Sequence, residues 1–333
     1  MRFVKLTLTA LIGATLAAPA AAKPRHAPPP PVPEVLASFD QSAGESPEDV
    51  YLDPWGNTYV VLSLSGEVRK IAADGTQSTY AQLPIGTPFE FCSGFYSLAG
   101  PITFDLFGNM FISVGACGPV NRGVWRVPPG GGTPIQVVQL PDDSFPNGNV
   151  LMGGKLYVAD SNLATIWEIN PYSSAAEGNA AEVWAQSPLI ERNVAGAGFP
   201  GANGIQRFRR SFYVAATDKA TIVEFPILRD GTSGSPSVYA ETGVGCDDMA
   251  FDFFGNLYCA SFFDTVLKID KHGGVETVLE GGDLDGPTSV AFGRTWDDFL
   301  EIYVTNGSFP GFSAKNTPTL MRYRVGVPGA IPY

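Results

Sequence analysis

A chain of 333 residues with a net charge of −12 is a poor partner for nucleic acids and for anionic membrane surfaces, because its field repels polyanions. Its 38 glycines and 28 prolines leave few helix-forming runs, and together with 44% hydrophobic residues they favour an all-β protein with many turns. Its two histidines, His26 and His272, are too few for a Ser-His-Asp or Cys-His device or for a histidine-rich zinc or iron site.

The N-terminus has the layout of a signal peptide over residues 1–22. A basic start is followed by apolar residues 6–17, which are too few to span a bilayer, and by small residues that favour cleavage after Ala22. Residues 23–34 are rich in proline and form an extended linker. We therefore expect a secreted or periplasmic protein with one folded domain over residues 35–333.

One short phrase recurs along that domain: an apolar strand, a Gly-Asn turn and a second strand with an aromatic residue. Full copies cover residues 48–60, 101–111 and 247–258. The aromatic residue recurs at intervals of 45 to 56 residues, at Tyr59, Phe111, Tyr157, Tyr213, Tyr258 and Tyr303. A period near 45 residues, with about four short strands in each unit, is typical of β-propeller blades. The repeat predicts a six-bladed β-propeller rather than a pair of β-sandwiches.

The remaining strands follow this repeat in chain order. Third strands are expected at residues 66–71, 123–127, 164–169, 220–225 and 264–269. The sixth blade has strands at residues 287–292, 301–305 and 319–325, and it lacks an obvious fourth strand. Residues 35–39, just before the first blade, can supply that strand. Closing the ring in this way removes exposed sheet edges.

The four cysteines have no metal-type Cys-x-x-Cys spacing, and export makes disulfides possible. We favour a pair between Cys92 and Cys117, because Cys92 lies in a predicted loop and Cys117 ends the strand that follows. Cys259 lies inside a predicted strand and is expected to be a buried apolar thiol.

Alignment of the repeats on their aromatic residues brings four polar residues to one equivalent position. Glu48 and Asp247 precede their aromatic residue by 11 positions, and Asn147 and Asn203 precede theirs by 10, in hairpins with a shorter turn. In chain order the position is filled by Glu48, Gly100, Asn147, Asn203, Asp247 and Thr288. Because the inner strands of a propeller start at the same mouth of the central channel, this position predicts a ring of side chains there.

Two carboxylates and two amide oxygens in one ring are hard ligands for a divalent cation. We expect Glu48, Asn147, Asn203 and Asp247 to bind Ca²⁺, with Mg²⁺, Mn²⁺ or Zn²⁺ as alternatives. Each of these residues taken alone also suits the capping of a turn at the start of a strand. The shared register of all four favours the metal site.

These features resemble the senescence-marker-protein/gluconolactonase (regucalcin-like) family of six-bladed propellers. The resemblance covers about residues 40–326 and is strongest at Phe145-Pro146-Asn147-Gly148, Gly201-Ala202-Asn203-Gly204-Ile205 and Pro287-Thr288-Ser289-Val290-Ala291-Phe292-Gly293. In that family a Glu of the first blade, an Asn of the fourth and an Asp of the fifth hold a divalent metal, and an Asn of the third lies close by. The resemblance implies these roles for Glu48, Asn203, Asp247 and Asn147. It also implies that Asp247 is the general base of lactone hydrolysis.

Two positions depart from the family pattern. The first-blade Glu of the family commonly lies in a Gly-Glu-Ser-Pro-like phrase, which residues 44–47 resemble, so Glu45 is the second candidate for this ligand. Glu45 lies 14 residues before Tyr59, which starts too early and favours Glu48. In blade five, Asp248 stands where the family prefers glycine. Its carboxylate either raises the pKa of Asp247 or points to solvent.

The resemblance implies a metal-dependent hydrolase of a lactone or ester. The metal would polarise the carbonyl, and Asp247 would take the proton of the attacking water. Loops expected at the mouth carry several aromatic residues and few charges, which favours an apolar substrate; they are residues 84–100, 187–201, 262–263 and 306–313. A non-hydrolytic cyclase or condensing enzyme and a non-enzymatic ligand-binding propeller remain open alternatives. We expect a small-molecule substrate, no nucleic-acid or membrane partner, and a monomer.

Overall fold

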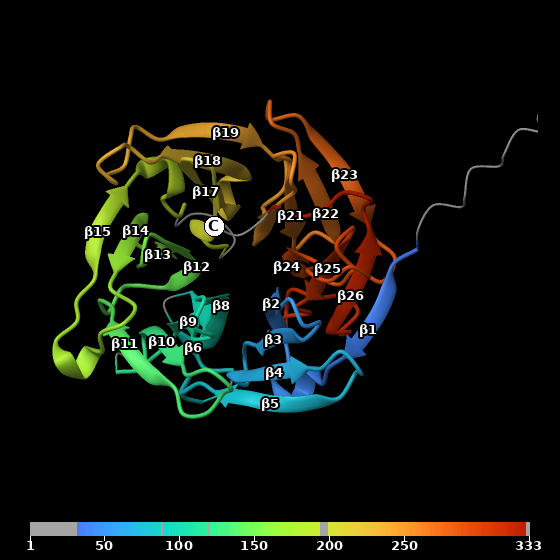
Figure 1. Cartoon of the computed structure of the whole chain (residues 1–333), viewed down its shortest axis with the longest axis horizontal. Coiled ribbons are helices and arrows are strands. Elements are labelled where there is room, and N and C mark those ends of the chain that lie inside the picture. The colour runs from blue at the N-terminus through green and yellow to red at the C-terminus, as the bar shows by residue number, and fades with distance from the viewer. Residues whose placement is uncertain (1–31, 88, 93, 119, 194–198, 331–333) are drawn as a thin grey trace, which may run out of the picture. The chain divides into compact units, whose positions relative to one another are not determined.

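The computed structural model describes residues 32–333, apart from positions 88, 93, 119, 194–198 and 331–333. These described residues contain no α-helix, and their strands form six four-stranded antiparallel sheets. The sheets are arranged in a ring around a central axis (Figure 1), with their first strands innermost. The predicted six-bladed β-propeller is confirmed. The predicted signal peptide and most of the predicted linker lie outside the described residues and stay predictions.

Each of the first five blades is built from four consecutive strands, counted outward from the channel. Blade one comprises β2 (Pro47–Leu52), β3 (Thr58–Leu62), β4 (Glu67–Ile71) and β5 (Gln77–Gln82). Blade two comprises β8 (Leu98–Phe104), β9 (Met110–Gly115), β10 (Gly123–Val127) and β11 (Ile135–Gln139). Blade three comprises β12 (Pro146–Met152), β13 (Lys155–Asp160), β14 (Thr165–Ile169) and β15 (Glu182–Gln186). Blade four comprises β16 (Ala202–Phe208), β17 (Ser211–Ala216), β18 (Thr221–Pro226) and β19 (Ser237–Glu241). Blade five comprises β20 (Met249–Phe251), β21 (Leu257–Ser261), β22 (Thr265–Ile269) and β23 (Val275–Glu280).

The sixth blade joins the two ends of the domain. Its strands are β24 (Pro287–Phe292), β25 (Glu301–Asn306), β26 (Thr319–Arg324) and, on the outside, β1 (Glu34–Ser38). An ion pair of 2.6 Å between Arg322 and Glu34 links the last two strands. Each inner strand contacts the inner strands of both neighbouring blades, including β2 with β24. The ring is therefore closed by the N-terminal strand, as the sequence predicted.

Short elements lie in the connections between these strands. They are the hairpin of β6 (Phe91–Cys92) and β7 (Phe95–Tyr96) and the 3₁₀ helices η1 (Gln41–Ala43), η2 (Ala175–Glu177), η3 (Pro188–Ile190) and η4 (Thr217–Lys219). In the described part of the chain we find no helix with the length and apolar character needed to cross a bilayer.

The recurring phrase forms the hairpin between the first two strands of blades one, two and five. Asp53 accepts hydrogen bonds from within its turn, including the backbone N–H (2.9 Å) and the side-chain amide (2.7 Å) of Asn57. Asp105 and Asp252 accept the equivalent bonds in their own turns. Gly56 has a φ of 85°, in the left-handed region that disfavours a side chain. These turns end the inner strands at one face of the propeller and leave their first residues at the other.

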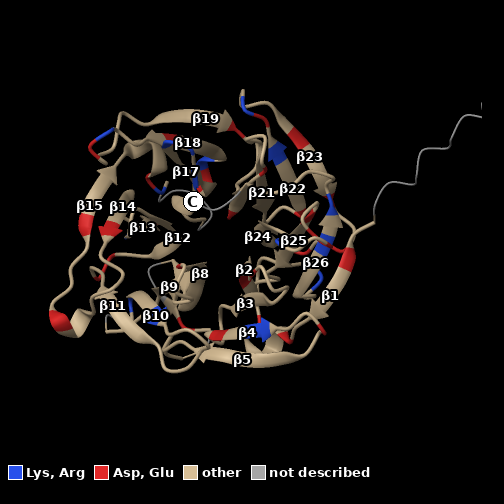
Figure 2. Cartoon of the chain, viewed as in Figure 1, with Lys and Arg blue, Asp and Glu red and all other residues tan. Residues whose placement is uncertain are grey.

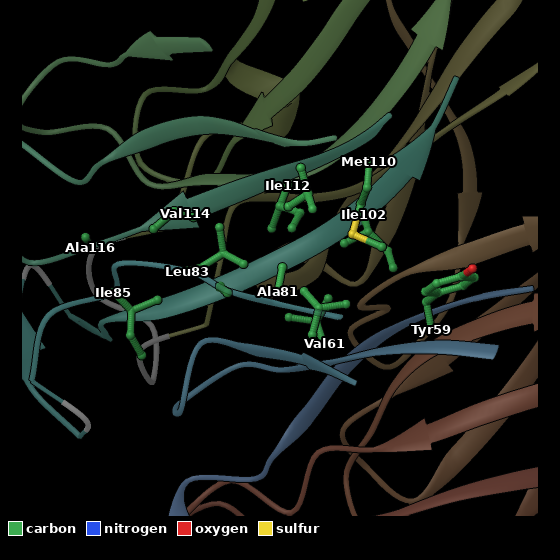
Figure 3. Packing of buried hydrophobic residues seen from close by; sticks show 13 residues of the cluster. Tyr59, Val61, Ala81, Leu83, Ile85, Ile102, Met110, Ile112, Val114 and Ala116 are labelled. Atoms are coloured by element: carbon green, nitrogen blue, oxygen red, sulfur yellow. The ribbon is translucent and has the colours of Figure 1, made fainter. Parts of the chain in front are cut away.

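Apolar side chains pack between neighbouring blades. Between blades one and two, for example, Val61, Leu83, Ile102 and Met110 are buried against one another (Figure 3). Each such side chain contributes about 1.5–3 kcal/mol to folding by leaving water. This packing holds the inner strands at fixed positions around the channel.

The prediction of a free thiol at Cys259 is wrong. Cys259 forms a disulfide with Cys246, with their Cα atoms 5.7 Å apart. The two residues lie on adjacent segments of blade five, since Met249 of β20 pairs with Cys259 of β21. The location of Cys259 inside a strand therefore does not isolate its thiol, because the neighbouring segment brings Cys246 beside it. The side chain of Cys92 lies outside the described residues, so the favoured Cys92–Cys117 pair stays a prediction.

We predict that the double variant Cys246→Ala/Cys259→Ala lowers the free energy of unfolding by about 2–3 kcal/mol, because the disulfide restricts the unfolded chain between two cysteines close in sequence. Urea unfolding of native and variant protein, followed by tryptophan fluorescence, measures this difference. An unchanged free energy of unfolding would contradict the prediction.

Candidate functional site

A β-bulge lies near the start of the inner strand in the blades that carry the predicted ligands. In blade one, Pro47 pairs with Leu62 and Asp49 pairs with Val61, so Glu48 is an extra residue without a partner opposite. The same shift in register surrounds Asn147 in blade three and Asn203 in blade four. An extra residue bends the strand and redirects its side chain. The bulge turns these side chains into the channel.

Blade five also has a bulge, in which two residues of the inner strand segment face a single residue of β21. The N–H of Asp247 donates to the carbonyl of Ala260 (2.8 Å), and the N–H of Ala260 donates to the carbonyl of Asp248 (3.0 Å). Asp247 and Asp248 therefore share one partner on β21, as the residues of a bulge do. Their side chains diverge: Asp247 lines a cavity at one mouth of the channel, and Asp248 lines a cavity at the other.

All four predicted ligands line the first of these cavities. Glu48 has only 5% of its surface exposed and Asp247 only 2%, and Asn147 and Asn203 are equally buried. Acidic segments of the inner strand β2 can be followed beside the channel in Figure 2. The structure thus brings together the residues that the repeat placed at one equivalent position.

The orientation of both amides is fixed by the hydroxyls behind them. Ser161 donates its only hydroxyl proton to the carbonyl of Ala202 (2.6 Å), so it must accept from Nδ2 of Asn147 (3.4 Å). Thr217 donates to the carbonyl of Cys246 (2.5 Å) and accepts from Nδ2 of Asn203 (3.1 Å). These two contacts fix which end of each amide is the nitrogen, and both amide oxygens are left without a partner among the described residues.

One oxygen of each predicted ligand is buried without a hydrogen-bond partner among the described residues. These atoms are Oε2 of Glu48, Oδ1 of Asn147, Oδ1 of Asn203 and Oδ2 of Asp247. A buried acceptor without a partner costs about 1–3 kcal/mol, and more when it is charged. Four such oxygens in one cavity fit the ligand set of a hard divalent cation. In the described residues no metal-type group of three His, Cys, Asp or Glu exists, so such a cation would have to use the amides.

The pKa shifts of the two carboxylates in the cavity also favour a cation site. Burial, together with the charges of Asp49 and Asp248, raises the pKa of Glu48 from 4.5 to about 8. Burial and the charge of Glu48 raise the pKa of Asp247 well above its ordinary value. Both side chains therefore lack compensation for their negative charge, which a bound cation would supply.

The structure separates the two candidates for the first-blade ligand. Glu45 forms an ion pair with Arg69 (2.6 Å) and is not among the residues that line the cavity, whereas Glu48 is. Thr288, the blade-six residue of the ring position, donates to the carbonyl of Pro47 (2.9 Å) and thereby supports the bulge at Glu48. Asp248 is buried rather than exposed to solvent, and its charge contributes to the raised pKa of Asp247.

Aromatic side chains form the wall of the cavity above these oxygens. They come from the loops predicted to surround the mouth and are Phe91, Phe95, Tyr96, Phe199, Phe262, Phe309 and Phe312. Phe145, which the sequence argument left out of the wall, also lines the cavity and stacks on Phe95 with ring centroids 4.2 Å apart. Phe145 stands two residues before Asn147 in the sequence, and this proximity to a predicted ligand could have placed it in the wall. On Phe95 lies Arg192, 4.1 Å from the ring centroid.

Phe199 is the residue through which several of these aromatics are connected. Its ring lies 6.3 Å from that of Phe262, 5.8 Å from that of Phe263 and 6.2 Å from that of Phe312. Phe312 is more than half exposed, so the wall opens to solvent at its rim. The cavity therefore combines an apolar rim with a polar floor.

Comparison with known proteins rests on structure. No family model matches the sequence, and no curated protein matches it. The structure is similar to a luciferin-regenerating enzyme, with a TM-score of 0.65 and 16% identity over 91% of this chain and 98% of that one. It is similar to the calcium-binding protein regucalcin of Agrobacterium tumefaciens, with a TM-score of 0.65 and 16% identity over 91% and 97%. It is also similar to a gluconolactonase of Xanthomonas campestris, with a TM-score of 0.63 and 15% identity over 90% of each chain.

The chain has the regucalcin and gluconolactonase fold. The resemblance that the sequence motifs indicated is confirmed at this level.

We predict that the cation-free protein loses stability as pH rises from about 4.5 to about 8. Because burial raises the pKa of Glu48 and of Asp247, the folded state binds more protons than the unfolded chain in this window, and the free energy of unfolding falls with pH. The stabilising contribution is complete below the unfolded pKa and is lost as pH passes the folded value. Urea unfolding in the presence of a chelator, at several pH values, measures the slope.

The variant Glu48→Gln should reduce this slope, and Glu45→Gln should not, because Glu45 has its own cationic partner and a lowered pKa. A stability that rises toward pH 8 in the chelated native protein would contradict the account of the cavity.

Proposed function

We propose that this protein is a divalent-cation-dependent hydrolase of an apolar lactone or ester. The observation that carries the proposal is the set of four unpartnered oxygens on the floor of a cavity with an aromatic wall. The structural neighbours support it, since they include a protein described as a gluconolactonase and one described as calcium-binding. Hydrolysis of a lactone is a reaction that a carboxylate base and a cation can perform without histidine.

The four oxygens fit a hard cation of the Ca²⁺ type. Glu48, Asn203 and Asp247 would hold it, with Asn147 as a fourth ligand or as a contact to the substrate. When bound, such a cation supplies a Lewis acid that polarises the ester carbonyl and stabilises the negative charge that develops on its oxygen. Two carboxylates balance the charge of one divalent cation, which is consistent with the absence of any other ion pair for them among the described residues.

Asp247 is the residue that we assign to proton transfer. Its Oδ2 atom has no hydrogen-bond partner within the described structure and faces the cavity. It accepts a proton from the water that attacks the carbonyl carbon and returns it to the alkoxide that leaves. Water attacks directly, so the chain needs no nucleophilic side chain for a covalent intermediate.

The aromatic wall selects and orients the substrate. Its side chains bury an apolar acyl or ring group and offer few hydrogen-bond donors, so a sugar lactone with many hydroxyls fits less well. The apolar group lies against the wall, and the ester carbonyl points down to the polar floor. This arrangement also keeps bulk water from the reacting atoms.

We further propose that the protein works outside the cytosol, in the periplasm or the extracellular space. The predicted signal peptide motivates this location, and the disulfide between Cys246 and Cys259 is consistent with an oxidising compartment.

We predict that Asp247→Asn lowers kcat for a suitable lactone or aryl ester by at least about 100-fold, because a general base typically contributes 10²–10⁴. Asn203→Ala should lower both Ca²⁺ affinity and activity. Glu45→Gln is the matched control and should retain both, since its carboxylate pairs with Arg69 and does not line the cavity. Initial rates with a panel of lactones and esters, with and without chelator, provide the measurement.

Two results would overturn this function. Full activity in Asp247→Asn would remove Asp247 from the mechanism. A native protein that binds the cation and hydrolyses none of the panel would favour a cyclase or a ligand-binding protein.

We predict that Phe199→Ala raises KM for an aryl ester by about 10-fold, because the loss of an aromatic contact costs about 0.5–1.5 kcal/mol beyond the lost area. The matched control is Phe253→Ala, a phenylalanine more than half exposed in the first hairpin turn of blade five, at the opposite face. Rates for an aryl ester and for a sugar lactone measure the effect. A larger loss with the sugar lactone than with the aryl ester would contradict an apolar substrate.

A further inference from the structure

The residues that follow Glu48 and Asp247 in the sequence belong to a second ring of polar side chains in the channel. Asp49 follows Glu48, and Asp248 follows Asp247, yet both line a separate cavity of about 410 Å³ that opens at the opposite mouth. Both carboxylates are buried. The bulges explain how neighbouring residues face different cavities, because an extra residue in a strand turns consecutive side chains away from simple alternation.

Hydrogen bonds tie this second ring together across several blades. Ser289 of blade six donates to Asp49 of blade one (2.6 Å) and lies 3.5 Å from Oδ2 of Asp248 in blade five. The other oxygen of Asp49 accepts the N–H of Ile102 in blade two (2.7 Å). Next to it, Asn149 of blade three donates to the carbonyl of Pro101 (2.6 Å). The polar groups of five blades therefore converge on one level of the channel.

Asn149 provides an independent sign of a ligand. A carbonyl can only accept, so the contact with Pro101 fixes Nδ2 at that side, and Nδ2 also donates to Ser113 (3.1 Å). The Oδ1 atom is left without a partner among the described residues, although only 6% of Asn149 is exposed. Asn149 lines the same cavity as Asp49 and Asp248. Asn149 therefore adds a buried amide oxygen without a hydrogen-bond partner to the residues that line this cavity.

The carboxylates of the second ring have no ion-pair partner among the described residues. One divalent cation at the first ring balances Glu48 and Asp247, and no lysine or arginine forms an ion pair with Asp49 or Asp248 among the described residues. Two arginines line the second cavity. Arg294 follows the end of β24 and donates to the hydroxyl of Tyr51 (2.6 Å), and Arg207 lies near the end of β16 and donates to the carbonyl of Arg209 (3.3 Å).

We propose that Asp49, Asp248 and Asn149 form a second binding site for a hard divalent cation, reached from the mouth opposite the hydrolytic cavity. Two carboxylates and an amide oxygen repeat the ligand chemistry of the first ring, and the hydroxyl of Ser289 lies beside them. The cation joins blades one, three and five directly. Its binding does not depend on the proposed hydrolysis, and it stabilises the closed ring from within the channel.

The test is the number of Ca²⁺ ions bound per chain, measured by equilibrium dialysis of the chelator-stripped full-length protein. The native protein is expected to bind two Ca²⁺. Asp248→Asn is expected to bind one, because the charge at the second ring is halved, and Asn203→Leu is expected to bind one, at the second ring. The double variant is expected to bind none.

A native protein that binds a single Ca²⁺ at saturation, which Asn203→Leu loses and Asp248→Asn keeps, overturns the proposal, as does an Asp248→Asn variant that retains both. If Asp248→Asn fails to fold, Asn203→Leu still decides: one remaining Ca²⁺ supports the second site, and none overturns it. Failure of the first site gives a different result, in which the native protein binds one Ca²⁺, Asn203→Leu keeps it and Asp248→Asn loses it. Thermal unfolding with and without Ca²⁺ confirms that each variant is folded.

Discussion

Buried negative charge is the constraint on which this propeller depends. Glu48, Asp49, Asp247 and Asp248 meet in the central channel, and no lysine or arginine among the described residues forms an ion pair with them. An isolated carboxylate in such a place is costly unless it is neutralised by a proton or a cation. The apolar packing between blades therefore holds four buried carboxylates close together. Their charge favours the binding of a cation in the channel.

The backbone around the channel is adapted to that crowding. A Cβ on Gly148 would lie 2.6 Å from the carbonyl oxygen of Asn203, and one on Gly204 would lie 2.4 Å from Oδ1 of Asp248. Glycine at these two places lets adjacent inner strands approach closely enough to bring their oxygens into one cavity. The Asn-Gly pairs of blades three and four thus combine a ligand with the small residue that makes room for its neighbours.

The sequence alone was enough to predict the blades and the ring position, because both repeat in the chain. The turn that Asp53 organises recurs at a fixed spacing, and Glu48 and Asp247 stand at the same distance from their aromatic residues. The disulfide between Cys246 and Cys259 was not predicted, because it depends on which residues face each other across two strands. The second ring was also missed. Simple alternation along a strand gives no reason for Asp49 and Glu48 both to face the channel, and only the bulge supplies one.

Different parts of the first cavity have different roles, and together they explain how a chain with two histidines could catalyse hydrolysis. The floor supplies charge and a proton acceptor, the amides are fixed by the hydroxyls behind them, and the wall supplies apolar contact. The most direct test of this account is the anomalous difference map of a crystal soaked in Mn²⁺. The account predicts a peak coordinated by oxygens of Glu48, Asn147, Asn203 and Asp247. An empty first cavity at saturating Mn²⁺ would contradict it.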